Sequence, residues 1–125
     1  MVTTNGILLD DKKFNWFIKH ADDIQLAISC DGPSEESNKN RSYSFNEQLI
    51  YKYLKEYPNP IIGFRITPSS IKNLFRDIAY FHEINNKCEI QAGRIIDKNI
   101  KFTEDLIQEY KEQLELLYQY YIDNP

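Results

Sequence analysis

The sequence predicts an α/β fold built from four strand-helix units around a parallel sheet. Short apolar runs that suit buried strands alternate with longer segments in which apolar residues recur at helical spacing. One helix separates each strand from the next, and crossovers of this kind are right-handed and make the strands parallel. With 125 residues, the chain is expected to form one domain over residues 1–125.

The four strands are predicted from apolar runs that end at turn signals. The first, MVTTN, stops at Asn5-Gly6, and the second, over 24–30, stops at Asp31-Gly32-Pro33 because proline cannot continue a strand ladder. The third is expected over 61–67 and the fourth over 87–93. The carboxyl end of each strand is therefore marked by polar or turn-forming residues.

The helices are predicted from capping residues and from the spacing of apolar side chains. Asp10-Asp11 is expected to cap a helix to about His20, and a second helix, whose apolar face begins with Phe45, ends before Pro58. Pro68-Ser69-Ser70 predicts the start of a third helix that runs to about residue 85. Thr103 opens the longest helix, whose expected apolar stripe consists of Leu106, Ile107, Tyr110, Leu114, Leu117, Tyr118 and Tyr121.

Two architectures fit this order of elements. A small doubly wound α/β domain has the right length, whereas a TIM-like barrel needs about 250 residues and eight strand-helix units. The four units predicted in this chain are half of such a barrel. The first strand begins at Met1 without a lead-in, and both outer strands are expected to be exposed edges. This favours part of a TIM-like barrel cut from a larger protein, with the doubly wound domain as the alternative.

Charge and cysteine content exclude several classes of function. The net charge is -4 and no basic patch is present, which argues against nucleic acid or an anionic membrane as partner. No apolar run approaches the roughly 18 residues that a membrane span needs, so a cytoplasmic location is expected. Cys30 and Cys88 match no zinc or redox spacing, and we expect two reduced, buried thiols and no metal site.

Polar residues follow every predicted strand, at the edge where α/β proteins bind ligands. Each also has a local explanation, for example a turn at Asn5 or at Asp31, and the sequence leaves both explanations open. Ser29 closes an apolar strand, and Arg41 follows it across a polar loop; together they could hold a carboxylate, because an arginine fork binds carboxylates through two hydrogen bonds. The strand-end residues are Thr4, Asn5, Ser29, Asp31, Arg65, Thr67, Gln91 and Arg94.

Common catalytic signatures are absent from the sequence. It contains no GxGxxG, GxxxxGK[ST], HExxH or GxSxG motif. His20 and His82 both fall on predicted helices, where a structural or exposed role is expected. No residue is therefore singled out as catalytic.

Four stretches occur in an order and spacing typical of one enzyme family. They are Thr3-Thr4-Asn5-Gly6-Ile7-Leu8-Leu9, Ala27-Ile28-Ser29-Cys30-Asp31-Gly32-Pro33, Asn38-Lys39-Asn40-Arg41 and Phe64-Arg65-Ile66-Thr67-Pro68. Over almost the whole chain, this set resembles the middle of radical SAM enzymes with a SPASM-type extension, such as sulfatase-maturating enzymes and peptide maturases.

The resemblance implies a partial (β/α)6 barrel that binds S-adenosylmethionine and a [4Fe-4S] cluster and generates a 5′-deoxyadenosyl radical. Ser29 and Arg41 match the positions that bind the methionyl carboxylate. Thr4 and Asn5 match the turn beside the cofactor and substrate, Arg65 matches a basic position on the substrate side, and Gln91 matches the strand near the adenosine. A peptide or protein is the substrate class implied.

The sequence departs from the family at several points. It lacks the CxxxCxxC cluster motif and the glycine-rich GGEP-like strand end, and Ser37 stands where the loop motif usually has histidine. A four-iron cluster held by this family's motif needs three thiolates, and the chain has two cysteines. We therefore expect that the isolated chain does not cleave S-adenosylmethionine and that it self-associates through its sheet edges. The alternative is a standalone small α/β binding or interaction domain.

Overall fold

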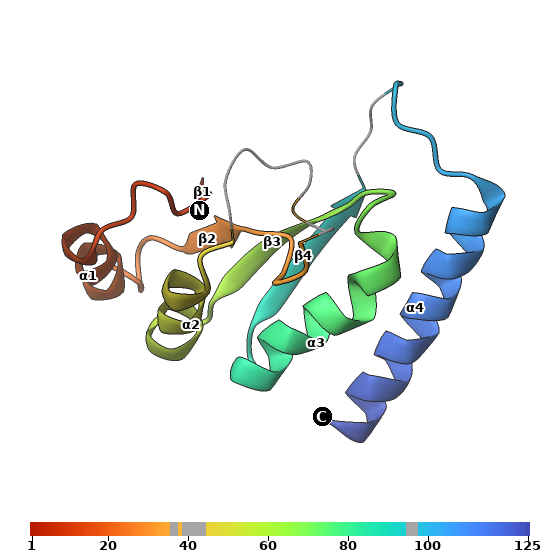
Figure 1. Ribbon diagram of the computed structural model, residues 1–125. Coiled ribbons are helices and arrows are strands. Elements are labelled where there is room, and N and C mark those ends of the chain that lie inside the picture. The colour runs from red at the N-terminus through yellow and green to blue at the C-terminus, as the bar shows by residue number, and fades with distance from the viewer. Residues whose placement is uncertain (36–37, 39–44, 95–97) are drawn as a thin grey trace.

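The computed structural model describes residues 1–35, 38, 45–94 and 98–125. Within these residues, four strands form one parallel sheet in the order β1-β2-β3-β4 (Figure 1), which confirms the expected α/β class. The elements in chain order are β1 (Val2–Thr4), α1 (Asp11–Lys19), β2 (Leu26–Ser29), α2 (Glu47–Glu56), β3 (Ile61–Ile66), the 3-10 helix η2 (Ile71–Asn73), α3 (Leu74–Ile84), β4 (Glu89–Arg94) and α4 (Glu104–Asp123).

Side-chain caps fix the first turns of three helices. Asp10 accepts a hydrogen bond from the Lys13 N–H at 2.8 Å and begins α1, as the sequence predicts. Thr103 caps α4 in the same way, through the Leu106 N–H at 3.3 Å. Asn46 caps α2 at the Leu49 N–H, 3.1 Å away. The cap at Asn46 places the start of α2 at residue 47, two residues after the expected start.

The helices of the described chain pack on one face of the sheet, where they lie side by side in Figure 1. Successive side chains of a strand point to opposite faces, so Leu26 and Ile28 share a face, and Ile62 and Phe64 continue it on β3. These residues form one buried cluster with Phe14, Ile50, Tyr53, Leu54, Leu74, Ile78, Phe81 and Leu117, which come from all four α-helices. We call the opposite face of the sheet the open face.

Two tyrosines of the α2 region tie the starts of the central strands together. The buried Tyr53 hydroxyl donates to the Leu26 carbonyl and accepts from the Ile61 N–H at 2.8 Å. Tyr57 accepts from the Leu26 N–H at 3.0 Å and donates to the Ile24 carbonyl at 2.9 Å. Burial raises the pKa of Tyr53 well above its usual value, so the hydroxyl stays protonated and able to donate.

The third helix begins later than the sequence predicts. Pro68-Ser69-Ser70 does not start it: one turn of 3-10 helix intervenes, and α3 begins at Leu74. The Ser70 hydroxyl makes no cap bond, because it accepts from the Thr67 N–H at 2.8 Å while the Ser70 N–H reaches the Thr67 hydroxyl at 3.2 Å. The two hydroxyls close a local turn in place of a helix cap.

The expected apolar stripe of α4 is only partly buried. Leu117 is the one buried residue of this helix, and Leu106 and Tyr110 are half-buried. Ile107, Leu114, Tyr118 and Tyr121 are exposed, Tyr118 to 70%. Among the described elements, the helix packs mainly against α3 and η2, which do not cover the full width of its apolar face.

Candidate functional site

Ser29 and Gln91 lie in one row across the open face of the sheet. The strand register aligns Ser29 with Gly63 and Gly63 with Gln91, and aligned residues of parallel strands point to the same side. Ser29 is half-buried and Gln91 is exposed. The structure thus places in one row two residues that the family resemblance implies at a cofactor site.

Gly63 leaves the backbone bare between these two side chains. A Cβ atom built on Gly63 would lie 3.7 Å from the Ser29 Cα and 4.0 Å from its Cβ, which is ordinary contact, so packing does not require glycine here. Glycine inside a strand often marks a place where a ligand approaches the backbone. Ser29 and Gln91 are two strand spacings apart, about 9.5 Å, which leaves room for a ligand group over Gly63.

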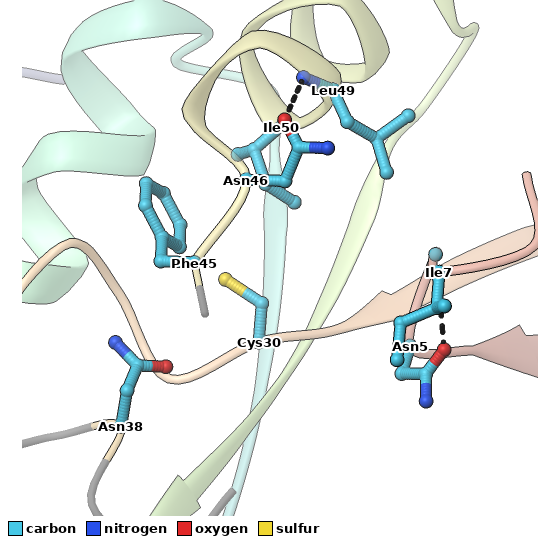
Figure 2. Close-up of a pocket in the computed structure, with 9 residues that line it drawn as sticks. Asn5, Ile7, Cys30, Asn38, Phe45, Asn46, Leu49 and Ile50 are labelled. Carbon is cyan, nitrogen blue, oxygen red and sulfur yellow. Dashed lines mark hydrogen bonds between the residues drawn. The ribbon is translucent and has the colours of Figure 1, made fainter. Parts of the chain in front are cut away.

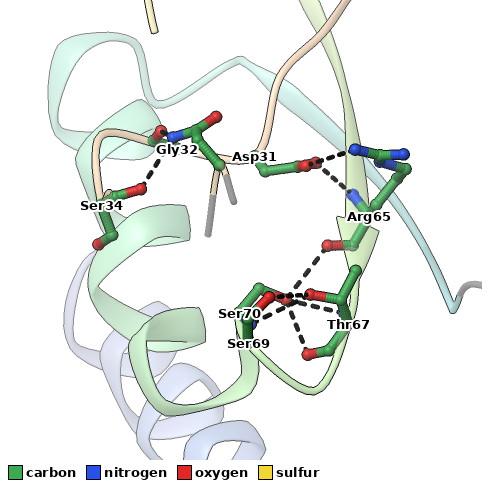
Figure 3. A network of polar contacts seen from close by, with 8 residues as sticks. Asp31, Gly32, Ser34, Arg65, Thr67, Ser69 and Ser70 are labelled. Atoms are coloured by element: carbon green, nitrogen blue, oxygen red, sulfur yellow. Dashed lines mark hydrogen bonds and ion pairs between the residues drawn. The ribbon is translucent and has the colours of Figure 1, made fainter. Parts of the chain in front are cut away.

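Arg65 is paired with the buried Asp31 (Figure 3). Asp31 Oδ1 accepts from the Arg65 backbone N–H at 2.9 Å, and Oδ2 lies 3.3 Å from Arg65 Nη2. Asp31 is fully buried, whereas the Arg65 side chain is 36% exposed. This pair joins the carboxyl ends of β2 and β3, which gives Arg65 a structural task beside the substrate-side role implied by the family resemblance.

The segment that follows β2 is held by a second buried carboxylate. The Ser34 hydroxyl donates to Asp77 of α3, and Arg76 Nη2 lies 3.0 Å from the same hydroxyl. Asn38 donates to the Gly32 and Ser34 carbonyls at 2.7 and 2.8 Å. Gly32 has a φ of 91°, and a Cβ there would lie 2.5 Å from the Asp77 Cβ. Only glycine fits this position without displacing α3.

The sequence did not single out Asp77, and for Asp31 it left open a strand-end ligand role and a local turn, neither of which is the observed pairing. Both are fully buried, and charged side chains are rarely buried unless paired. Asp77 lies on the apolar face of its predicted helix, between Leu74 and Ile78, and that position was an available signal. For Asp31 the chain offered no comparable sign, because its partner is 34 residues away.

Thr4 and Asn5 form the turn after β1. The Thr4 hydroxyl accepts from the Gly6 N–H at 3.1 Å, and Asn5 Oδ1 accepts from the Ile7 N–H at 3.0 Å. The interpretation of Asn5 as a turn former is confirmed. Asn5 is exposed and Thr4 half-buried.

A pocket of about 220 Å³ lies beside this turn, on the helix side of the sheet (Figure 2). Its three asparagine side chains are hydrogen-bonded to nearby backbone groups: Asn46 to the Leu49 N–H, Asn5 to the Ile7 N–H and Asn38 to the Gly32 carbonyl. The volume is below the roughly 300–1,000 Å³ typical of small-molecule sites. The pocket is lined by Asn5, Gly6, Ile7, Cys30, Asn38, Phe45, Asn46, Leu49 and Ile50.

The two cysteines lie at opposite ends of the sheet and are not joined in a disulfide. Cys30 directly follows β2 and is buried, whereas Cys88 directly precedes β4 and is half-buried. Burial raises the pKa of the Cys88 thiol to about 12, so it carries a proton at neutral pH. Among the described residues, no group of three histidine, cysteine or carboxylate side chains is arranged to hold a metal ion.

Arg41 and Ser37 lie outside the described residues, and so does the side chain of Arg94. The predicted pairing of Ser29 with Arg41 therefore stays a prediction.

Comparisons with protein-family models, with curated proteins and with solved structures give no match to this chain. Of the helices that the structure describes, none is both long and apolar enough to cross a membrane.

Proposed function

We propose that this chain is the middle part of a radical SAM barrel, in which Ser29 and Arg41 bind the methionyl carboxylate of S-adenosylmethionine. The observation that carries the proposal is the uninterrupted strand order β1-β2-β3-β4 with the helices packed on one face. A barrel wall has this arrangement, since its helices form an outer ring and its ligands bind inside, at the carboxyl ends of the strands. A doubly wound sheet reverses its strand order and carries helices on both faces.

The positions of the proposed cofactor residues support this proposal. Ser29 and Gln91 are on the open face, which becomes the inner face when such a wall is completed. Ser29 ends β2 and therefore lies at the edge where barrel ligands bind. A hydroxyl and an arginine fork are suitable donors for a carboxylate.

The iron-sulfur cluster does not fit the residues of this chain. A four-iron cluster of this family needs three thiolates, whereas the sequence has two cysteines, which lie at opposite ends of the sheet. The high pKa of Cys88 further disfavours a thiolate there. We therefore place the cluster ligands outside these 125 residues and derive no chemical step that uses the cluster.

Binding of S-adenosylmethionine tests the carboxylate assignment. We expect the chain to bind S-adenosylmethionine more tightly than its decarboxylated analogue in equilibrium dialysis. A charge-assisted hydrogen bond contributes about 1.5–3 kcal/mol, so Arg41→Ala should weaken binding about 10- to 100-fold. Lys39→Ala, which removes a cation from the same loop, is the control. Equal binding of both ligands, or equal effects of the two substitutions, would contradict the assignment.

Activity and gene context test the larger proposal. After anaerobic reconstitution with iron and sulfide, the chain should produce no 5′-deoxyadenosine; accumulation of this product would show that cluster ligands lie within it. In-frame DNA immediately upstream should encode CxxxCxxC and a GGEP-like stretch. A stop codon at that place would instead favour a standalone α/β binding domain.

A further inference from the structure

Two of the four glycines are required by the backbone, and the other two are not. Gly6 and Gly32 have φ values of 84° and 91°, which disfavour any residue with a Cβ atom. Gly63 and Gly93 lie inside β3 and β4, and neither has a positive φ. A Cβ atom on Gly63 would make ordinary contacts, and one on Gly93 would have nothing within 4 Å among the described residues. Because glycine weakens a strand, the fold alone does not explain these two positions.

Both strand glycines lie beside Arg65 on the open face of the sheet. Gly63 is two residues before Arg65 on β3, so the two positions share a face. Gly93 is aligned with Arg65 in the register of β3 and β4, and it points to the same side. The Arg65 side chain is therefore bordered by bare backbone along its own strand and on β4. Glycines inside strands often mark a place where a ligand comes close to the backbone.

Asp31 holds the Arg65 guanidinium from the other side of β3. Asp31 follows β2, whereas Gly93 belongs to β4, and β3 lies between these two strands. Asp31 Oδ2 lies 3.3 Å from Arg65 Nη2, and Figure 3 shows another guanidinium nitrogen that points away from Asp31. The Asp31 side chain is fully buried, whereas 36% of the Arg65 side chain is exposed. A buried carboxylate thus orients a guanidinium that solvent reaches, which lowers the entropy lost when that guanidinium binds an anion.

The accessible part of the open face lies towards the carboxyl ends of the strands. Ala27 and Ile61, which are aligned one row nearer the amino ends than Gly63, are 2% exposed. Gly93, beyond that row, is exposed. The carboxylate on the same face of β4, Glu89, is four residues before Gly93, or about 13 Å along the strand. An anion placed over Gly93 is therefore beside a guanidinium and remote from the carboxylate of its own strand.

We propose that Arg65 binds an oxyanion of a ligand, a carboxylate or a phosphate group, in the space over Gly93. The guanidinium is a planar fork of five N–H donors, which suits both groups, and an anion bound by the nitrogens that point away from Asp31 leaves the ion pair intact. The subsite lies at the edge where ligands bind in barrels and in doubly wound sheets alike. It rests on the contacts of Arg65 and holds whether or not S-adenosylmethionine binds.

Titration of the full chain with simple anions tests the subsite. In amide NMR spectra, sodium acetate or sodium phosphate should shift the Arg65 and Gly93 backbone signals in a saturable way, whereas sodium chloride at the same ionic strength should not. Tighter binding of acetate would assign the subsite to a carboxylate, and tighter binding of phosphate to a phosphate ester. The absence of a saturable shift with both anions, or an equal shift with chloride, would overturn the proposal.

Filling the space over Gly93 tests where the anion binds. Gly93→Leu leaves Arg65 and Asp31 unchanged, and the loss of a charge-assisted hydrogen bond should weaken anion binding about 10- to 100-fold. Thr3→Leu adds the same side chain to the same face on β1 and should bind as the wild type does. Equal affinities of these two variants would refute the location.

A third variant tests the guanidinium without filling the space. Arg65→Lys keeps a positive charge near Asp31 and removes the fork, so the anion should bind about tenfold more weakly or worse. Circular dichroism checks that each variant is folded, and wild-type affinity in folded Arg65→Lys would refute the role of the fork. If S-adenosylmethionine binds but the anion shifts are absent, the subsite is wrong and the proposed function stands; the converse result removes the proposed function alone.

Discussion

The ion pair between Asp31 and Arg65 predicts a measurable coupling between two strand ends. Arg65→Met keeps the aliphatic stem and removes the guanidinium, which leaves the buried Asp31 carboxylate without its cation. Asp31→Asn keeps an oxygen that can accept from the Arg65 N–H and removes the charge. The double variant removes both charged groups, so the three variants form a thermodynamic cycle.

The burial of Asp31 determines how much unfolding free energy the loss of its cation should cost. Breaking a buried ion pair from one side costs about 3–5 kcal/mol. Because the Arg65 side chain is 36% exposed, water screens the pair, and we expect Arg65→Met to cost about 1–3 kcal/mol. For a chain of this length, that corresponds to a fall in Tm of about 3–5 °C per kcal/mol. The expected coupling energy is about 1–2 kcal/mol, since the double variant leaves no charge buried alone.

Urea unfolding of the wild type and the three variants measures the cycle. The pair of Lys52 and the exposed Asp11, with a shorter N–O distance of 2.8 Å, is the matched control. Its cycle, made with Lys52→Met and Asp11→Asn, should give the smaller coupling because Asp11 is 88% exposed, whereas Asp31 is fully buried. Additivity at Asp31 and Arg65 within about 0.5 kcal/mol would refute the argument and leave Arg65 available to a ligand.

Three further predictions concern the core, a turn and pH. Tyr53→Phe should lower the free energy of unfolding by about 1–3 kcal/mol, because the Ile61 N–H loses its buried partner, whereas Tyr118→Phe at an exposed site should leave the urea midpoint unchanged. Gly32→Ala should lower Tm strongly, since the new Cβ meets Asp77 and the backbone has a positive φ; a Tm within the error of the wild type would contradict the turn geometry. Stability should fall as pH rises from about 8.5 towards 12, because the unfolded chain ionises Cys88 first and the folded pKa is about 12. Cys88→Ala should reduce this slope, by at most about 1.4 kcal/mol per pH unit, and an unchanged slope between pH 8 and 10 would exclude Cys88 as its source.

Local patterns predicted the elements well, and they did so where the deciding contacts are short in sequence. The caps at Asp10 and Thr103 reach three residues ahead, so the residues that make them are adjacent on the page. The start of α3 was predicted wrongly because Ser70 has two partners within reach, the helix and Thr67. A local sequence pattern does not show which of two competing hydrogen bonds the Ser70 hydroxyl makes.

The candidate site was predicted only in part. Ser29 and Gln91 were both predicted at strand ends. Ser29 does end β2, whereas Gln91 is the third of six residues in β4, and the register places the two in one row with Gly63. The position of Gly63 between these two side chains could not be predicted from any one strand, because it depends on how three strands align. In the same way, Arg65 was placed at a ligand edge from its position in β3, but its buried partner Asp31 lies just beyond the end of another strand, β2.

The sequence by itself determined the order of the elements and the α/β class, and it placed Ser29 correctly at a strand end. These depend on hydrophobic period, capping and turn residues, which act over a few positions of the chain. Only the tertiary structure decided the strand order, the face that the helices cover and the exposure of most of the α4 stripe. Such features arise from contacts between distant residues, such as Ser34 with Asp77, 43 positions apart, and from the limited surface that α3 and η2 offer to α4.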